Sequence, residues 1–278
     1  MATCEVCFRH CEIEEGGTGF CLARTCEKGQ VVAGNYGRVT ALALDPIEKK
    51  PLARFYPGSL ILSVGSYGCN LRCPFCQNHP ISWSEEAEEA AGTAGKMSPK
   101  ELARMAEQYR DRGNMGIAFT YNEPLVGYEF VRDTAKLIRD KGMKNVMVTN
   151  GTAELAVLRE ILPYIDAMNI DLKGFTDRYY RQVLGGDREM VLDFIREAAA
   201  GCHVELTTLI IPGENDTEEE MEEIAAWIAG VDREIPLHIS RFFPTFHMTD
   251  RKATEVGLIY RLAEIARNRL PHVYTGNC

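Results

Sequence analysis

The chain has no apolar run long enough to cross a bilayer, because its longest apolar stretches are strand-length and a spanning helix needs about 20 residues. Its first residues lack the basic and then apolar pattern of an export signal. Basic residues are the minority, with 31 Lys and Arg against 40 Asp and Glu, and they form no stripe that could follow a phosphate backbone. We therefore expect a cytoplasmic protein with no membrane partner, and we disfavour a nucleic-acid partner.

What the chain does have is a core-forming composition and many cysteines. With 278 residues, 45% hydrophobic and 26% charged, it can bury the core of one main domain with a small addition. Ten cysteines without an export signal favour free, metal-binding thiols over disulfides, because the cytosol is reducing. Eight of them fall in two groups, Cys4, Cys7, Cys11, Cys21 and Cys26, and then Cys69, Cys73 and Cys76.

Composition divides the chain into three parts. Residues 1–35 are rich in Cys and Gly without a sustained helical or strand period, which is typical of a small segment folded around a metal. Residues 36–58 are predicted to be a connector, with a short strand at 38–44 and a polar turn at 45–51. Residues 59–278 are predicted to form the main domain.

The main domain alternates short apolar runs with amphipathic helical patterns. Strands are predicted at 60–64, 116–120, 145–149, 167–171, 204–211 and 236–242, and helices at 98–112, 127–141, 152–163, 187–200, 217–229 and 253–269. Six successive strand–helix units require long crossovers, which predicts an α/β fold: a partial (β/α)6 TIM-like barrel with parallel strands. The acidic segment 84–96 is predicted to be either an exposed flexible insert or a short surface helix.

A Cys-x3-Cys-x2-Cys run, Cys69, Cys73 and Cys76, directly follows the first predicted barrel strand. Three thiolates can ligate three irons of a cubane cluster and leave the fourth open to another ligand. Thiolates also suit zinc, but a structural zinc site needs four protein ligands. The spacing therefore favours an iron–sulfur cluster over the alternative, a zinc knuckle that borrows a ligand from elsewhere.

This motif, with Phe75 in its aromatic position, resembles the hallmark of the radical S-adenosylmethionine (SAM) superfamily. The resemblance is closest to the pyruvate formate-lyase activating enzyme-like branch, and within it to AmmeMemoRadiSam-type proteins, through residues 45–51, 55–59 and 76–78. It implies a [4Fe-4S] cluster on Cys69, Cys73 and Cys76, with SAM bound to the open iron. Reductive cleavage of SAM would then give methionine and a 5'-deoxyadenosyl radical. Further implied partners are an electron donor such as flavodoxin or ferredoxin and a protein substrate, a glycyl radical enzyme.

Polar motifs follow the predicted strands, and a parallel barrel gathers these strand ends at one edge. The resemblance implies that Glu123, in Thr-Tyr-Asn-Glu-Pro, holds the SAM ammonium where relatives carry Gly-Gly-Glu-Pro. Tyr121 and Asn122 replace the glycine pair, so the backbone contacts differ, and a plain capping turn is the alternative. Phe75 is a further cofactor-binding candidate.

The later strand ends supply the remaining candidates. The resemblance implies that Lys173 pairs with the SAM carboxylate, and that Thr149 of the Thr149-Asn150-Gly151 segment contacts SAM or a cation together with Asp171. It also implies that residues 210–216 pack on adenine and that His247 touches the ribose. The alternatives are generic turns and, for His247, an exposed loop histidine.

The N-terminal thiols Cys4, Cys7, Cys11 and Cys21 could close a second metal centre, because the segment is too small for a core of its own. Four thiolates suit zinc or an iron–sulfur cluster alike. Cys26 could replace Cys21, and unligated thiols are the alternative.

Three functions follow in order of preference. The first is a radical SAM enzyme that abstracts a hydrogen atom in the manner of a glycyl radical enzyme activase. The second keeps the radical chemistry but acts on a small molecule or peptide. The third, from another class, is a cysteine-rich metal-binding or electron-transfer protein without SAM chemistry.

Overall fold

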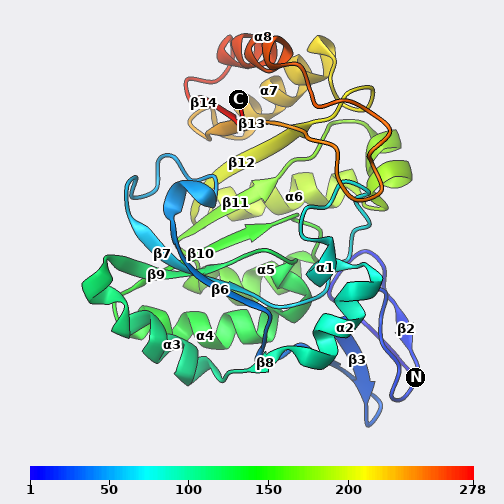
Figure 1. The fold of residues 1–278 in the computed structure, drawn as a ribbon, viewed down its shortest axis with the longest axis vertical. Helices are drawn as coiled ribbons and strands as arrows, with labels where there is room; N and C mark the ends of the chain where they lie inside the picture. Colours follow the sequence, from blue (N-terminus) through cyan, green and yellow to red (C-terminus); the bar gives the residue numbers. More distant parts are fainter.

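One eight-stranded sheet forms the centre of the computed structural model, which describes residues 1–278 (Figure 1). Its strands in spatial order are β14 (Val273–Gly276), β13 (Leu237–Arg241), β12 (His203–Ile210), β11 (Ala167–Asp171), β10 (Lys144–Thr149), β9 (Asn114–Phe119), β7 (Leu60–Gly65) and β6 (Ala41–Pro46). All neighbours are parallel except β6, which is antiparallel to β7. The sheet does not close, since β6 and β14 stay at its edges, and the predicted partial barrel is confirmed.

Six helices connect the parallel strands and pack against them (Figure 1). They are α3 (Pro99–Gln108), α4 (Tyr128–Asp140), α5 (Leu155–Ile161), α6 (Arg188–Ala199), α7 (Glu218–Asp232) and α8 (Val256–Arg267). A capping box begins α3: the Ser98 hydroxyl accepts the Glu101 amide, and the Glu101 carboxylate accepts the Ser98 amide. None of the helices combines the length and apolarity that crossing a membrane would require.

Two further strands lie at the edges of the six predicted barrel strands. β6 overlaps the short strand predicted at 38–44 in the connector, but it continues to Pro46, so that Asp45, predicted to begin a polar turn, lies within the strand. Asp45 is buried within the strand because it accepts hydrogen bonds from Lys50 Nζ, at 3.0 Å, and from the Tyr121 hydroxyl, at 2.8 Å. β14 is a four-residue strand after the last helix, too short for a clear pattern.

The connector also closes the amino end of the sheet. Ile47, Leu52 and Phe55 are buried against residues of β7, β9, β10 and β11. Glu205 on β12 is fully buried and accepts the amides of Ala53, at 2.9 Å, and Arg54, at 2.8 Å. The barrel therefore has a floor made from residues 47–55, and its open end lies at the carboxyl ends of the strands.

The N-terminal segment consists of two small antiparallel hairpins, β1 (Ala2–Thr3) with β2 (Glu12–Ile13) and β3 (Arg24–Glu27) with β4 (Gln30–Ala33). It continues into β5 (Arg38–Val39), which pairs with β8 (Gly95–Lys96). The short helices α1 (His79–Ser82) and α2 (Glu85–Thr93) lie between the main sheet and this end of the molecule (Figure 1). Of the two alternatives for residues 84–96, the structure has the helix.

Candidate active site

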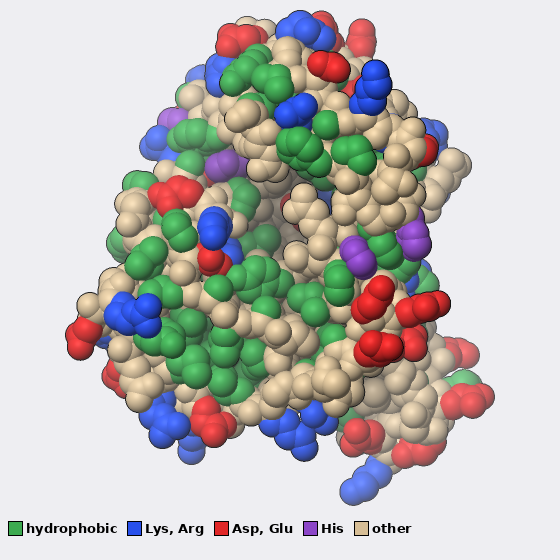
Figure 2. Space-filling view, in the orientation of Figure 1, with side chains coloured by type: hydrophobic (Ala, Val, Ile, Leu, Met, Phe, Trp, Pro, Cys, Tyr) green, Lys and Arg blue, Asp and Glu red, His purple; other side chains and the backbone are tan.

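The loop after β7 brings Cys69, Cys73 and Cys76 to one cavity of about 310 Å³, and the space-filling view shows a hollow near the centre of the molecule (Figure 2). Phe75 lines the same cavity. Burial raises the pKa of all three thiols, that of Cys73 to about 12, so their ionisation needs a compensating cation. The three cysteines of the predicted motif thus share one site.

This cysteine loop lies directly on the N-terminal segment. The Cys69 amide donates to the Cys21 carbonyl at 3.1 Å. A Cβ at Gly68, whose φ is +97°, would lie 2.5 Å from that same carbonyl oxygen, so only glycine fits. The position of Cys69 therefore depends on the residues around Cys21.

Glu123 follows β9 and is buried at the cavity wall. Its carboxylate accepts hydrogen bonds from the Thr149 hydroxyl at 2.7 Å, the Asn150 amide at 2.8 Å and the Leu125 amide at 3.1 Å. Burial raises the pKa of Glu123 to about 7, although these hydrogen bonds favour the ionised form. A cationic or amino ligand in the cavity would hold Glu123 ionised.

Tyr121 and Asn122 stand where the resembling family has two glycines, and both have defined roles. Tyr121 has φ +76°, a conformation that favours glycine, and its hydroxyl donates to Asp45 while its ring lies 4.7 Å from Lys50 Nζ. The Asn122 side chain accepts the Ser66 amide at 2.9 Å and donates to the Gly68 carbonyl at 3.1 Å. The chain thus adopts a left-handed conformation here without glycine, and Asn122 joins this turn to the cysteine loop.

The ends of β10 and β11 complete the polar wall. Asn150 Nδ2 lies 3.7 Å from Cys69 Sγ and donates to Asn70 Oδ1 at 3.0 Å. Lys173 Nζ pairs with Asp171 at 2.7 Å. Burial opposes the charge on Lys173, but Asp171 and Cys73 outweigh it and raise the pKa of Lys173 well above its usual value. Thr149, Asn150, Asp171 and Lys173 all line the cavity, as the sequence predicts, and Val148 lines it as well.

The far wall contains residues that sequence reasoning misses. Besides Leu209, they are polar groups that come from β12, β13 and the C-terminus: Thr207, Ser240 and Asn277. The predicted adenine-packing segment 210–216 begins with the buried Ile210 and Ile211, neither of which lines the cavity. Strand alternation is the only sequence signal for these far-wall residues, since Thr207 and Leu209 are two residues apart and share one face of β12.

His247 does not line the cavity. Its amide donates to the Pro74 carbonyl at 2.9 Å, and its ring lies 3.8 Å from that of Phe246 and 5.7 Å from that of Trp83. The loop between β13 and α8 is therefore fastened to the cysteine loop through its backbone at His247. The ring itself belongs to an aromatic cluster beside the cavity.

The N-terminal thiols share a second, much smaller cavity of about 10 Å³. It is lined by Cys4, Cys7, Cys11 and Cys21 together with Arg9 and Arg24. Cys26 does not line it, and its thiol instead lies 3.7 Å from the Glu15 carboxylate. Nowhere in the 278 residues do three His, Cys, Asp or Glu side chains meet as ligands of one metal ion, so a second metal centre is not shown.

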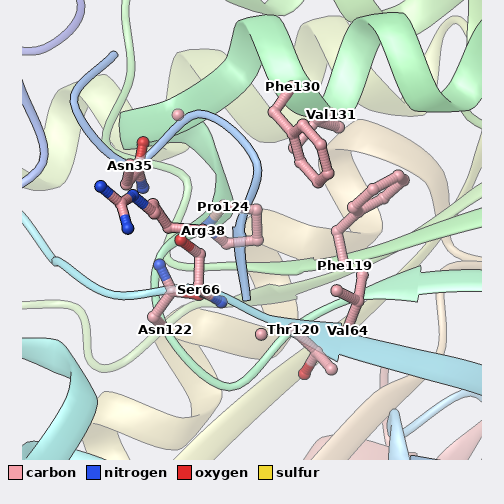
Figure 3. A pocket seen from close by; sticks show the side chains of 12 residues that line it. Asn35, Arg38, Val64, Ser66, Phe119, Thr120, Asn122, Pro124, Phe130 and Val131 are labelled. Atoms are coloured by element: carbon pink, nitrogen blue, oxygen red, sulfur yellow. The ribbon is translucent and has the colours of Figure 1, made fainter. Parts of the chain in front are cut away.

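A third cavity lies behind the loops that follow β7 and β9 (Figure 3). Arg38, Ser66 and Asn122 form its polar side, and Phe119 and Phe130 lie on the apolar side (Figure 3). Its volume of about 30 Å³ is far smaller than that of the main cavity and too small for an organic substrate. The main cavity is therefore the site at which a cofactor could bind.

Comparison with known proteins identifies the family. Residues 63–228 match the model of the radical SAM superfamily. The chain is 42% identical to an uncharacterised protein of Methanocaldococcus jannaschii, over 99% of this chain and 80% of that protein. It is 27% identical to the pyruvate formate-lyase-activating enzyme of Clostridium pasteurianum, over 71% of this chain and 80% of that enzyme.

Among solved structures, the fold is similar to that of Streptococcus suis SuiB bound to S-adenosylmethionine, with a TM-score of 0.60 and 14% identity. The match covers 76% of this chain and 48% of that one, so it spans about half of the SuiB chain. The family implies a [4Fe-4S] cluster and SAM, and three cysteines facing a cavity with a carboxylate and an ammonium group fit both. The chain belongs to the radical SAM superfamily, among proteins similar to the pyruvate formate-lyase-activating enzymes.

Proposed function

We propose that this protein cleaves SAM reductively at a [4Fe-4S] cluster held by Cys69, Cys73 and Cys76, and that it abstracts a hydrogen atom from its substrate. Bound there, the cluster would pass one electron to SAM, which gives methionine and a 5'-deoxyadenosyl radical, and transfer of the substrate hydrogen yields 5'-deoxyadenosine. The observation that carries the proposal is that the three cysteines, Glu123 and the Asp171–Lys173 pair line one cavity.

The chain's own residues would bind and orient SAM. Glu123 would accept a hydrogen bond from the amino group, because its buried carboxylate faces the cavity beside Cys69. Lys173 would pair with the SAM carboxylate, and Asp171, 2.7 Å away, fixes the direction of its ammonium group. Thr149, whose hydroxyl donates a hydrogen bond to Glu123, would hold that carboxylate in place. His247, outside the cavity lining, would reach a ribose only if its loop moved inward.

The substrate we favour is a protein, as for a glycyl radical enzyme activase. A cavity of about 310 Å³ is at the lower end of the volumes that hold one small molecule. With SAM inside, a substrate would have to react at its rim, and an extended protein segment can reach that position from solvent. Similarity to the Clostridium pasteurianum enzyme supports the same class. The electron would come from a low-potential donor such as flavodoxin or ferredoxin. A small molecule or peptide is the alternative substrate.

We also propose that Cys4, Cys7, Cys11 and Cys21 hold a second metal centre, of zinc or iron–sulfur type. These four thiols line one cavity that excludes Cys26, which supports the choice of Cys21 as the fourth ligand. A centre closed by four thiolates leaves no position for SAM, so its role would be to stabilise the segment.

One assay tests the proposed function. The chain is reconstituted anaerobically with iron and sulfide, then incubated with SAM and dithionite, and 5'-deoxyadenosine is measured. Formation of 5'-deoxyadenosine by the wild type, and none by the Cys69, Cys73 and Cys76 triple alanine variant, is the expected result. A wild type that binds iron but forms no 5'-deoxyadenosine would instead indicate a metal-binding or electron-transfer protein without SAM chemistry.

The same triple variant tests the second centre through its metal content. Retained zinc would indicate a structural ion, and retained iron with sulfide a second cluster. A triple variant without bound metal would refute the N-terminal site.

A further inference from the structure

Phe20, the residue before Cys21, is held between two arginine side chains. The guanidinium carbon of Arg9 lies 3.4 Å from the centroid of the Phe20 ring, and that of Arg72 lies 3.7 Å from it. Two guanidinium groups cannot occupy the same face of one ring at such distances, so they must cover opposite faces. The three side chains form a stack in which one arginine comes from the N-terminal segment and the other from the cysteine loop.

Both arginines also hydrogen-bond the backbone of the cysteine loop. Arg9 Nε donates to the Asn70 carbonyl at 2.8 Å, and its Nη2 donates to the Gly185 carbonyl at 2.6 Å. Arg72 Nη1 donates to the carbonyls of Cys69, at 2.9 Å, and Leu71, at 3.0 Å, and its Nη2 donates to the Phe20 carbonyl. The stack therefore holds the backbone of the cysteine loop from Cys69 to Leu71.

Neither guanidinium has a carboxylate partner. Arg9 and Arg72 form no ion pair, whereas Arg24 nearby pairs with Glu129 at 2.7 Å. Burial lowers the pKa of both arginines, but a guanidinium stays charged at any physiological pH. The cysteine loop is thus flanked by two positive charges that no carboxylate of the protein pairs with.

We propose that Arg9 and Arg72 are positioning residues that hold the cysteine loop through Phe20, and that their unpaired charges raise the reduction potential of the cluster on that loop. The inference rests on the proposed function only in requiring a cluster at Cys69, Cys73 and Cys76. Reduction adds one electron from an external low-potential donor and breaks no bond. Fixed positive charges nearby favour the reduced state, because it is more negative by one charge.

The test is a reductive titration of the reconstituted chain, followed by the electron paramagnetic resonance signal of the reduced cluster. In Arg9→Gln and in Arg72→Gln the ratio of reduced to oxidised cluster at a fixed potential should fall about tenfold, which corresponds to about 59 mV for one electron. Arg112→Gln is the matched control, because this arginine lies beside Tyr109 near the amino end of β9. It should leave the ratio unchanged.

Two more variants separate charge from positioning. Arg72→Lys keeps the charge but not the planar, bidentate group, and Phe20→Leu keeps both charges but removes the stack. Both should retain the wild-type potential and lose iron to a chelator several-fold faster. Wild-type potentials in both glutamine variants would overturn the electrostatic part, and unchanged iron loss in Phe20→Leu and Arg72→Lys would overturn the positioning part. A wild type that takes up no cluster would refute the proposed function instead.

Discussion

The two cysteine groups of this chain present the same ligand atom in different surroundings. The N-terminal cavity measures about 10 Å³, and its charged lining consists of Arg9 and Arg24. The barrel cavity measures about 310 Å³ and is lined by Glu123, Asp171 and Lys173. The first has room for little more than an atom or a water molecule, and the second has room for an organic ligand. Volume and charge, rather than the number of thiols, therefore distinguish the cavity that can hold an organic ligand from the one that cannot.

The largest effect should follow loss of a barrel cysteine. We expect Cys73→Ala to reduce 5'-deoxyadenosine formation to the level of a sample without protein, because two thiolates cannot hold the cubane in a productive position. Product analysis by chromatography measures it. Cys202→Ala, a change at the opposite end of the barrel where β12 begins, should keep the wild-type yield. Substantial 5'-deoxyadenosine formation by Cys73→Ala would contradict the proposal that the barrel cysteines, and not the N-terminal ones, support SAM cleavage.

An N-terminal cysteine should affect stability more than chemistry. We expect Cys7→Ala to lower the free energy of unfolding by about 3 kcal/mol, since loss of a metal ligand adds to loss of a buried side chain. Cys26→Ala, at a cysteine that is also buried but lies outside the cavity, should cost about 1 kcal/mol. Anaerobic urea unfolding compares the two. Equal costs would indicate that the N-terminal thiols bind no metal.

The charged lining of the barrel cavity should determine SAM affinity without determining cluster binding. We expect Lys173→Ala to raise the Kd of SAM about tenfold or more, because a charged hydrogen bond contributes about 1.5–3 kcal/mol. Calorimetry measures the Kd, and the visible absorbance reports the cluster. Lys144→Ala removes a lysine that pairs with Asp166 at the other end of β10 and should change neither. Loss of cluster absorbance in Lys173→Ala would contradict the role assigned to Lys173.

The smallest effect is a pH dependence specific to the barrel site. The pKa of Glu123 is raised to about 7, so its carboxylate is ionised above this pH and becomes protonated below it. SAM affinity should therefore be constant at higher pH and fall by at most tenfold per unit below about pH 7. Binding titrations between about pH 5.5 and about 8.5 measure the SAM affinity. Glu123→Gln is the control, and it should bind SAM more weakly and with an affinity that does not change with pH. The same slope in the control would assign the titration to another group.

The sequence predicts the cofactor side of the cavity well, because each residue there belongs to a motif at the end of a strand. Glu123, Thr149 and Lys173 each follow an apolar run, and the parallel order gathers such ends at one edge. Their roles toward SAM stay predictions. Thr207, Ser240 and Asn277 belong to no motif, and only the curvature of the sheet brings them to the cavity.

Asp45 shows a second reason why sequence reasoning fails. An acidic residue followed by proline has the pattern of a turn, and its burial in β6 depends on Lys50 and on the distant Tyr121. The sequence alone does not reveal these hydrogen bonds, because only the fold brings Asp45 and Tyr121 together. The position of His247 likewise depends on how its loop is fastened to Pro74, a contact between residues 173 positions apart.

The floor built by residues 47–55 determines from which end a ligand would reach the barrel cavity. Its apolar residues are buried, and the fully buried Glu205 fastens Ala53 and Arg54 from the strand above. This floor covers the amino end of the barrel, so a ligand in the cavity would enter and leave at the carboxyl ends of the strands. Any molecule seated deepest must arrive before the one above it and depart after it. In kinetic terms, a cofactor and a substrate bound in this cavity would share one entrance, which would favour ordered binding.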